Sequence, residues 1–305
     1  MPRPPDRRRF LAIAAAAIAA PGTLRAGTAA WRGTALGAAA SITLGGTGAA
    51  AADETFAAVA AELERLEQVF SLYRPESALS RLNRDGRLGA PPGDLVNLLA
   101  LSDALHAATG GAFDPTVQPL WLALARGGAT DARPTPEAAS DLVGWSGVAF
   151  DAAGIALSRP GMALTLNGVA QGHIADRIAA LLGALGYRDV LVDMGEIAAR
   201  GSRHGTAWSA DVAAPDGQVL RRLNLRDRAL AVSAPLGTLI DRERTIGHIL
   251  DPRAGAVAPE RLLVAVSAAS AAVADGLSTG CCLLSEAGAA RAVAEFPGAR
   301  LESLI

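Results

Sequence analysis

The chain has 305 residues, enough for one large domain or two small ones with a sizeable buried core. Half of its residues are hydrophobic but only 4% are aromatic, so Ala, Val and Leu must fill that core. The formal net charge of -2 gives no reason to expect nucleic acid or an anionic membrane surface as a partner, and the lack of lysine excludes Schiff-base mechanisms.

Residues 1–29 have the pattern of a signal peptide for the Tat export route. The twin arginine Arg7-Arg8 is followed by x-Phe-Leu and then by the alanine-rich stretch Ala12 to Ala20, which is too short to span a bilayer. The Tat route carries folded, often cofactor-loaded proteins, so we expect a periplasmic location. Cleavage is expected between Ala19 and Ala30, and an uncleaved membrane anchor is the alternative. No later apolar run is long enough to predict a transmembrane helix.

A long amphipathic helix is predicted from Asp53 to Phe70, because its apolar residues recur at spacings of three and four. The preceding segment Gly46-x-Gly48-x-x-Ala51 is similar to a dinucleotide-binding fingerprint. That interpretation requires a short helix and a second strand with an acidic end, which the long helix contradicts. A Gly/Ala loop with Asp53 as the helix cap fits better, and an NAD-linked dehydrogenase is a distant alternative.

Two stretches after this helix could contact a ligand. Tyr73 is the only aromatic residue expected to be exposed in the polar loop Ser71 to Gly86. A helix over Leu95 to Ala107 then leads to the turn Thr109 to Pro115, which is rich in backbone N–H groups and carries one carboxylate, Asp114. A ligand-binding loop and an ordinary turn after a helix explain this segment equally well.

The stretch Leu164 to Gly201 predicts a strand, a turn, a helix, a Gly stop and a second strand. The first apolar run, Ala163 to Leu166, ends at Asn167-Gly168, and the second, Val190 to Val192, breaks at Met194-Gly195-Glu196. Small polar turns of this kind can present backbone N–H groups to a ligand. A βαβ-like structural unit without a ligand is at least as good an interpretation.

The last third of the chain carries two candidate catalytic groups. His248 lies just ahead of a tight turn and is a plausible general base, because its unperturbed pKa is close to the working pH; a structural role is the alternative. The other three histidines show no metal-ligand spacing, so no zinc site is predicted.

A predicted helix then places three oxygen-bearing side chains on one face. These are Asp275, Ser278 and Thr279, at positions i, i+3 and i+4 among small apolar residues. A carboxylate buried there would need a partner, and Mg²⁺ is a suitable one; an ordinary Asp on a helix surface is the alternative. The adjacent Cys281 and Cys282 are predicted to be small buried hydrophobes.

In order and spacing, these pieces resemble the ApbE family of FAD:protein FMN transferases over nearly the whole mature chain. No single motif is decisive, but five or six in the right order are specific. In chain order they are Arg32-Gly33-Thr34, Phe70-Ser71-x-Tyr73 with Ser77 to Asn83, Gly111-Ala112-Phe113-Asp114-Pro115, Leu166-Asn167-Gly168-Val169-Ala170-Gln171-Gly172 with Ala175-Asp176, His248 to Arg253 with Gly255, and Ala274 to Thr279.

The resemblance implies a single α+β domain over residues 30–305, with mixed β-sheets flanked by helices and a central cleft near Gly168, His248 and Asp275. It also implies transfer of FMN from FAD to a Ser or Thr hydroxyl of a partner protein, with release of AMP. By similarity, FAD would be held by Tyr73, Ala112, Phe113, Asp114, Gln171 and His248, and Mg²⁺ by Asp275, Thr279, Ser278 and the Gly168 carbonyl. His248 and Asp275 would be the catalytic residues.

The signal peptide and the Asn167 to Gly172 motif are similar to the exported NosX branch of the family, which accompanies nitrous oxide reduction. The acceptor would then be a redox protein of the periplasm or membrane, such as a NosR-like protein with an FMN-binding domain. Departures from the family pattern at Arg32, Thr165, Gln171 and Gly195-Glu196 leave two rivals open. One is a flavin-binding protein or FAD pyrophosphatase, and the other is a maturation chaperone without catalysis.

Overall fold

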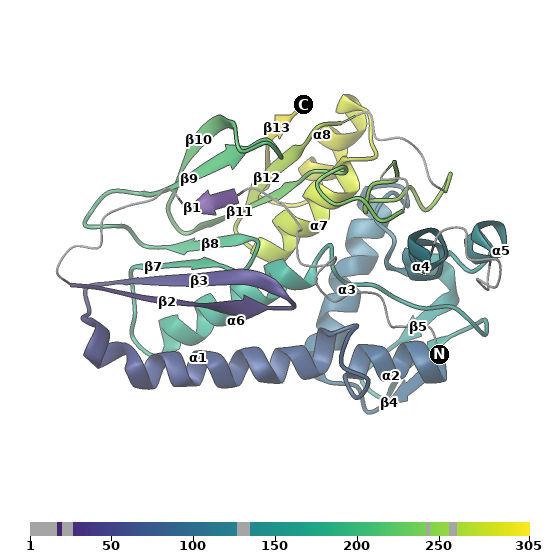
Figure 1. Cartoon of the computed structure of the whole chain (residues 1–305), viewed down its shortest axis with the longest axis horizontal. Coiled ribbons are helices and arrows are strands. Elements are labelled where there is room, and N and C mark those ends of the chain that lie inside the picture. The colour runs from purple at the N-terminus through teal and green to yellow at the C-terminus, as the bar shows by residue number, and fades with distance from the viewer. Residues whose placement is uncertain (1–16, 20–26, 127–134, 242–244, 256–260) are drawn as a thin grey trace.

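A seven-stranded sheet forms the centre of the computed structural model, which describes residues 17–19, 27–126, 135–241, 245–255 and 261–305 (Figure 1). Its strand order is β13-β12-β11-β8-β7-β3-β2, and every neighbouring pair is antiparallel. The strands are β2 (Thr28–Ala35), β3 (Ala38–Gly45), β7 (Val190–Asp193), β8 (Ile197–Arg200), β11 (Arg228–Ser233), β12 (Val264–Ala268) and β13 (Arg300–Leu304).

Two three-stranded antiparallel sheets accompany the central one. The first has the order β1-β9-β10 and the second β4-β6-β5. Their bounds are β1 (Ala17–Ala19), β9 (Trp208–Ala213), β10 (Val219–Leu225), β4 (Arg87–Gly89), β5 (Val148–Phe150) and β6 (Gly154–Leu157).

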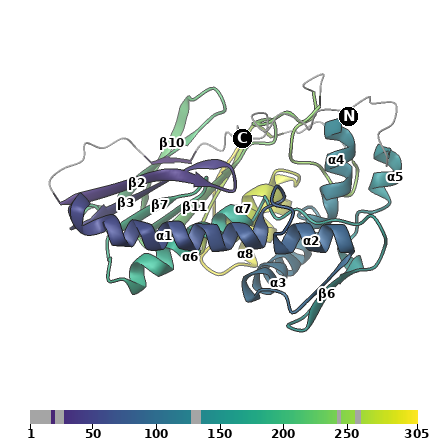
Figure 2. The ribbon, with the colours of Figure 1, turned by 60° about the horizontal axis from the view of Figure 1, so that its bottom comes forward.

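Helices cover one face of the central sheet and strand β9 covers the other. Side chains alternate between faces along a strand, so Val190 and Val192 of β7 face the helical core whereas Leu191 packs with Trp208 of β9. Helix α1 runs along the helical face near α6, as Figures 1 and 2 show. The helices are α1 (Ala49–Phe70), α2 (Ala78–Asp85), α3 (Gly93–Ala108), α4 (Gln118–Arg126), α5 (Pro136–Ser140), α6 (Ala170–Ala184), α7 (Ala271–Cys281) and α8 (Glu286–Ala294).

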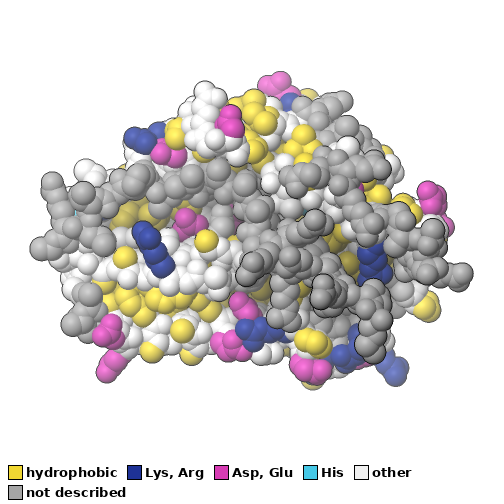
Figure 3. Space-filling model, viewed as in Figure 1, with side chains coloured by type: hydrophobic (Ala, Val, Ile, Leu, Met, Phe, Trp, Pro, Cys, Tyr) yellow, Lys and Arg dark blue, Asp and Glu magenta, His cyan; other side chains and the backbone are white. Residues whose placement is uncertain are grey.

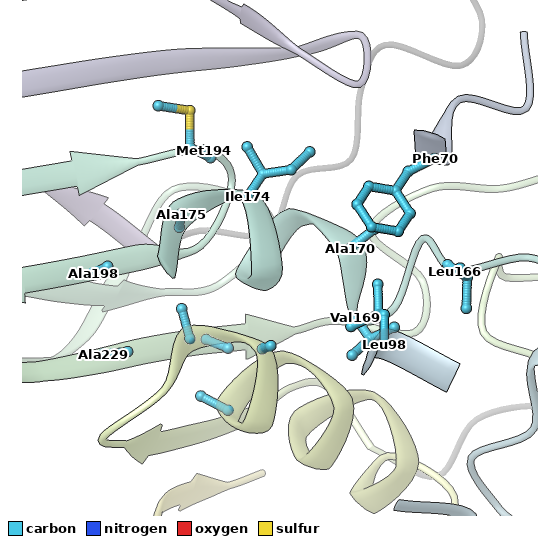
Figure 4. Close-up of a cluster of buried hydrophobic side chains, with 14 of the residues drawn as sticks. Phe70, Leu98, Leu166, Val169, Ala170, Ile174, Ala175, Met194, Ala198 and Ala229 are labelled. Carbon is cyan, nitrogen blue, oxygen red and sulfur yellow. The ribbon is translucent and has the colours of Figure 1, made fainter. Parts of the chain in front are cut away.

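The beginning of α6 is anchored in the core where several helices meet. Phe70 at the end of α1 and Leu98 of α3 lie beside Val169 and Ala170 (Figure 4), and all four side chains are at most 1% exposed. Because this apolar contact fixes the first turn of α6, it also fixes the loop that precedes it.

The α+β class and the single domain predicted from the sequence are confirmed, but the sheets are antiparallel rather than mixed. The expected strand over residues 163–166 does not form, so there is no βαβ unit. Instead, the side chain of Asn83 hydrogen-bonds the N–H and the carbonyl of Leu164, at 2.7 and 2.8 Å. Thr165 donates its N–H to the Pro115 carbonyl at 2.8 Å, so this segment is bound by loops rather than by a sheet.

The long helix α1 begins before Asp53, and Gly48 rather than Asp53 occupies the cap position. The loop 46–48 joins β3 to α1 and contributes no residue to the pocket described below, in line with the rejection of a dinucleotide fingerprint. Both cysteines are buried and free, as predicted.

Most of the proposed signal peptide lies outside the described residues; Ala17–Ala19 form β1, which pairs with β9. In the part of the chain that the structure describes, no helix has both the length and the hydropathy needed to cross a membrane. On the face seen in Figure 3, arginine and acidic side chains lie interspersed among the described residues, consistent with the low net charge.

Candidate active site

One cavity of about 350 Å³ lies where the end of β11, helix α7, the loop before α6 and the loop after α3 meet. Its volume is in the range of small-molecule sites. It brings together nearly all of the site residues predicted from the sequence, namely Tyr73, Ala112, Phe113, Asp114, Gly168, Gln171, His248, Asp275 and Thr279. Ser278 is the exception, because it does not line the cavity.

The close crossing of α6 and α7 positions the polar floor of this pocket. A Cβ on Gly172 would lie 2.3 Å from the carbonyl oxygen of Ala271, so only glycine allows the two helices to approach this closely. Asp176 of α6 accepts the N–H groups of Ala271 and Ala272 at 2.8 and 3.0 Å, and thereby caps the first turn of α7. The Gly172-x-x-x-Asp176 spacing is therefore a helix-packing device.

Asp275 is held at the floor by the same crossing. The Gly172 N–H donates to its Oδ2 at 3.0 Å, and the residue is only 3% exposed. Burial raises the pKa of Asp275 to about 7, with the Gly172 N–H opposing that rise and the charge of Asp176 adding to it. An ionised Asp275 would be stabilised by a cation in the pocket.

Glu196 lies next to Asp275 in the same lining. It is 3% exposed, and its Oε2 has no hydrogen-bond partner among the described residues. Burial raises its pKa well above the usual range, and the charges of Asp275 and Asp193 raise it further. Burial also raises the pKa of Asp193 to about 6. This end of the pocket is thus rich in carboxyl groups.

Hydroxyl groups lie beside these carboxyl groups. Thr279 lines the pocket. A Cβ on Gly168 would lie 3.0 Å from the Thr279 Oγ1, so the absence of a side chain at Gly168 keeps this hydroxyl from being covered. Ser278 is fully buried, and its hydroxyl donates to the Asp275 carbonyl at 3.0 Å. The predicted role of Ser278 as a cation ligand is therefore not supported by its position, because its side chain turns back toward its own helix.

His248 lines the pocket on the side of the loop that follows β11. Its Nδ1 lies 3.3 Å from the Thr238 carbonyl, which can only accept, so Nδ1 carries the hydrogen of the neutral ring. Burial lowers the pKa of His248, although the Thr238 and Pro235 carbonyls oppose this. The imidazole is therefore neutral at neutral pH and can accept a proton.

The Asp114 carboxylate is used within its own turn. Its Oδ1 accepts from the N–H and the hydroxyl of Thr116 at 2.8 and 2.6 Å, and its Oδ2 accepts from the Trp145 N–H at 3.2 Å. It therefore fixes the loop that carries Ala112 and Phe113. In this structure the carboxylate shapes the pocket wall.

Much of the remaining lining is apolar. Tyr73, which is 58% exposed as predicted, belongs to this apolar wall with its ring accessible. The wall also contains Leu72, Val117, Trp121, Leu122, Ile249, Leu250 and Leu283. The pocket can thus take a ligand with a flat apolar part, beside carboxyl groups that favour a cation.

The lining residues that the sequence did not identify as site residues include Ser233, Glu196 and Trp121. Ser233, at the end of β11, and Glu196, directly before β8, are polar residues next to buried apolar strands, and that contrast was the available signal. Trp121 lies in a short helix with no motif, and no sequence pattern distinguished it from a core residue.

Comparisons with known proteins identify the family of this chain. The model of the ApbE family matches residues 36–302. Two curated relatives named FAD:protein FMN transferase come from Haemophilus influenzae, 27% identical over 78% of this chain and 74% of that protein, and from Klebsiella pneumoniae, 27% identical over 82% and 77%.

Solved structures show the same fold. The flavinyl transferase ApbE of Pseudomonas stutzeri, in its apo form, superposes with a TM-score of 0.74 at 28% identity over 88% of both chains. The flavin transferase ApbE of Vibrio cholerae gives 0.75 at 25% identity over 88% of this chain and 90% of that one. This chain therefore belongs to the ApbE family, in line with the order of its motifs and the pocket that they build.

Proposed function

We propose that this protein is an FAD:protein FMN transferase that requires Mg²⁺. It would attach FMN through a phosphoester to a Ser or Thr hydroxyl of an acceptor protein and release AMP. The activity of the named relatives supports the reaction, and the two-sided pocket supports FAD as the donor, because FAD joins flat aromatic groups to an anionic pyrophosphate.

The observation that carries the cation requirement is the charge of the pocket. Among the described residues that line it there is no Arg or Lys, whereas Asp114, Glu196 and Asp275 are all present. When ionised, these carboxyl groups would repel a pyrophosphate brought beside them unless a cation neutralised the charge. The partnerless Oε2 of Glu196 fits the same requirement, since a buried oxygen that no hydrogen bond satisfies is costly and a cation could satisfy it.

The available donors suit a hard divalent cation. The Asp275 carboxylate, the Thr279 hydroxyl and the Gly168 carbonyl would hold Mg²⁺, all through oxygen, which is the ligand type Mg²⁺ prefers. When bound, Mg²⁺ would neutralise phosphate charge and polarise the phosphoryl group.

The protein's own residues would then orient and deprotonate the reactants. Tyr73 would pack against a ring of FAD, and the loop fixed by Asp114 would close the wall beside it. The acceptor oxygen forms a bond to the FMN phosphorus as the pyrophosphate P–O bond breaks, and AMP leaves with the bridging oxygen. The proton of the acceptor hydroxyl would pass to the imidazole of neutral His248.

The decisive experiment is intact-mass analysis of an acceptor fragment incubated with the purified protein, FAD and Mg²⁺, with AMP followed alongside. A mass gain of one FMN, equal to the AMP released and lost with EDTA, is expected. Asp275→Asn should abolish both products, whereas Asp85→Asn, an exposed aspartate of α2 outside the cavity described above, should not.

Other outcomes would identify the rival activities. AMP and free FMN without a labelled acceptor, across a panel of FMN-binding-domain fragments, would show an FAD pyrophosphatase. Bound FAD with no AMP would show a flavin-binding protein or a non-catalytic maturation chaperone.

We further propose that the protein acts after Tat export, on a periplasmic or membrane redox protein of the NosR-like kind. The twin arginine Arg7-Arg8 supports export, and the motif from Asn167 to Gly172 supports the NosX branch. Replacing Arg7 and Arg8 together with Lys should retain the protein in the cytoplasm, whereas the neighbouring Arg9→Lys should still be exported. Periplasmic recovery of the double variant would contradict the proposal.

A further inference from the structure

We infer that Ser233, assisted by Ser278, is a positioning residue that aims the oxygen lone pairs of Thr279 at the cation. This inference rests on the proposed cation site and adds to it a residue from another element. Ser233 ends β11 and Ser278 lies on α7, and both are buried, at 8% and 0% exposure.

Three short contacts link the hydroxyl groups into one chain. The Thr279 Oγ1 lies 3.3 Å from the Ser233 Oγ, and the Ser233 Oγ lies 2.7 Å from the Ser278 Oγ. The Ser278 hydroxyl lies 3.0 Å from the Asp275 carbonyl oxygen. The chain therefore begins at the pocket wall and ends on the backbone of α7.

The carbonyl end fixes the direction of every hydrogen in this chain. A carbonyl can only accept, so Ser278 donates to Asp275, and a hydroxyl has a single hydrogen to donate. Ser233 must therefore donate to Ser278, and Thr279 must donate to Ser233. The hydrogen of Thr279 is thereby turned away from the pocket.

The consequence for Thr279 is a preset ligand geometry. With its hydrogen directed at Ser233, its oxygen lone pairs are free to face the pocket that its side chain lines. Gly168 packs against the same hydroxyl without a side chain that could cover it. Without Ser233, the Thr279 hydroxyl could rotate and present its hydrogen to the cation. Without Ser278, Ser233 could donate to Thr279 and occupy one of its lone pairs.

The test measures cation binding directly. Mn²⁺ is titrated into the protein saturated with FAD, free Mn²⁺ is followed by electron paramagnetic resonance, and FAD alone gives the background. Ser233→Ala and Ser278→Ala are each expected to raise the Mn²⁺ dissociation constant about tenfold, in the range known for residues that orient metal ligands. Ser233→Thr, which keeps the hydroxyl, should restore binding.

Two controls separate positioning from general damage. Ser102→Ala removes another fully buried serine hydroxyl, one that donates to Leu98 within α3, and should leave Mn²⁺ binding unchanged. In a Thr279→Ala background, Ser233→Ala should cause no further loss, because Ser233 acts through Thr279. Additive losses, or wild-type binding by both serine variants, would overturn the inference.

The same titration distinguishes this inference from the proposed function. If Asp275→Asn and Thr279→Ala bind Mn²⁺ as tightly as the wild type, the cation site itself is wrong. If those two variants lose Mn²⁺ while Ser233→Ala and Ser278→Ala keep it, only the hydroxyl chain is wrong. Ser233→Ala alone decides the question if Ser278→Ala does not fold, as judged by thermal unfolding.

Discussion

At the scale of single residues, the pocket contains buried carboxyl groups whose preferred protonation state would change when a cation binds. Glu196 and Asp275 are almost completely buried, and burial favours their protonated forms. A cation would favour their ionised forms. Stability without ligand and affinity for the cation therefore oppose each other at these positions.

Glu196→Gln should separate these two effects. The neutral amide keeps the shape but removes the cost of keeping a buried carboxyl group protonated at this pH, so in EDTA at pH 8 the free energy of unfolding should rise. The apparent affinity for Mg²⁺ should fall at the same time. Urea unfolding in EDTA and the Mg²⁺ dependence of AMP release measure the two quantities, and a change of both in the same direction would refute this account.

Tyr73 offers a second test, on the apolar wall. Tyr73→Ala should raise the KM for FAD about tenfold, since an aromatic contact contributes about 1 kcal/mol beyond its buried area. Tyr73→Phe keeps the ring and should stay close to the wild type. Steady-state kinetics at saturating Mg²⁺ would check this, and an equal loss in both variants would point to the hydroxyl rather than the ring.

At the scale of elements, the site depends on the distance between α6 and α7. Gly172 permits their close approach, Asp176 caps α7, and the N–H of Gly172 holds Asp275. These contacts come from one short stretch of α6. The motif Gln171-Gly172 with Ala175-Asp176 is thus explained by helix packing as much as by ligand binding.

Gly172→Ala should disrupt this crossing. The new methyl group would overlap the Ala271 carbonyl, so the free energy of unfolding should fall by about 1–3 kcal/mol, and Asp275 should be displaced with loss of turnover. Gly93→Ala, at the start of α3 where a Cβ meets nothing within 4 Å, is the matched control. Denaturant unfolding and AMP release would measure both variants, and equal stability of the two would contradict the packing argument.

At the scale of the whole molecule, the buried carboxyl groups couple stability to pH. The pKa of Asp275 is raised from 3.8 to about 7 and that of Asp193 from 3.8 to about 6, so the folded state binds their protons more tightly than the unfolded state. Their contribution to stability is fully present below pH 3.8 and is lost as the pH rises through those higher values. Carboxyl groups with lowered pKa, such as Asp94, act in the opposite sense and mainly below about pH 4.

In EDTA, the unfolding free energy of the wild type should therefore fall relative to that of Asp275→Asn between about pH 4 and 7, and the difference should level off above that range. Saturating Mg²⁺ should reduce the fall in the wild type, because the cation replaces the proton, and should not do so in the variant. Urea unfolding across this pH range would show it, and a pH-independent difference would contradict the assignment.

Local pattern was enough for many of the elements and for the family. Helical periodicity is a property of neighbouring residues, so α3 and α6 could be predicted closely, and the order of motifs pointed to the ApbE family. The single α+β domain followed from the same motifs.

What only the tertiary structure decided depends on contacts between distant residues. Residues 163–166 have the composition of a strand, yet their hydrogen bonds with the side chain of Asn83 and the carbonyl of Pro115 keep them out of any sheet. Ser278 shares a helix face with Asp275, but its rotamer and the nearby Ser233 turn its hydroxyl away from the cavity, and Thr279 takes the place on the wall. Sequence spacing predicts which residues share a face of a helix. The hydrogen bonds that those residues make depend on the strand that packs against that face.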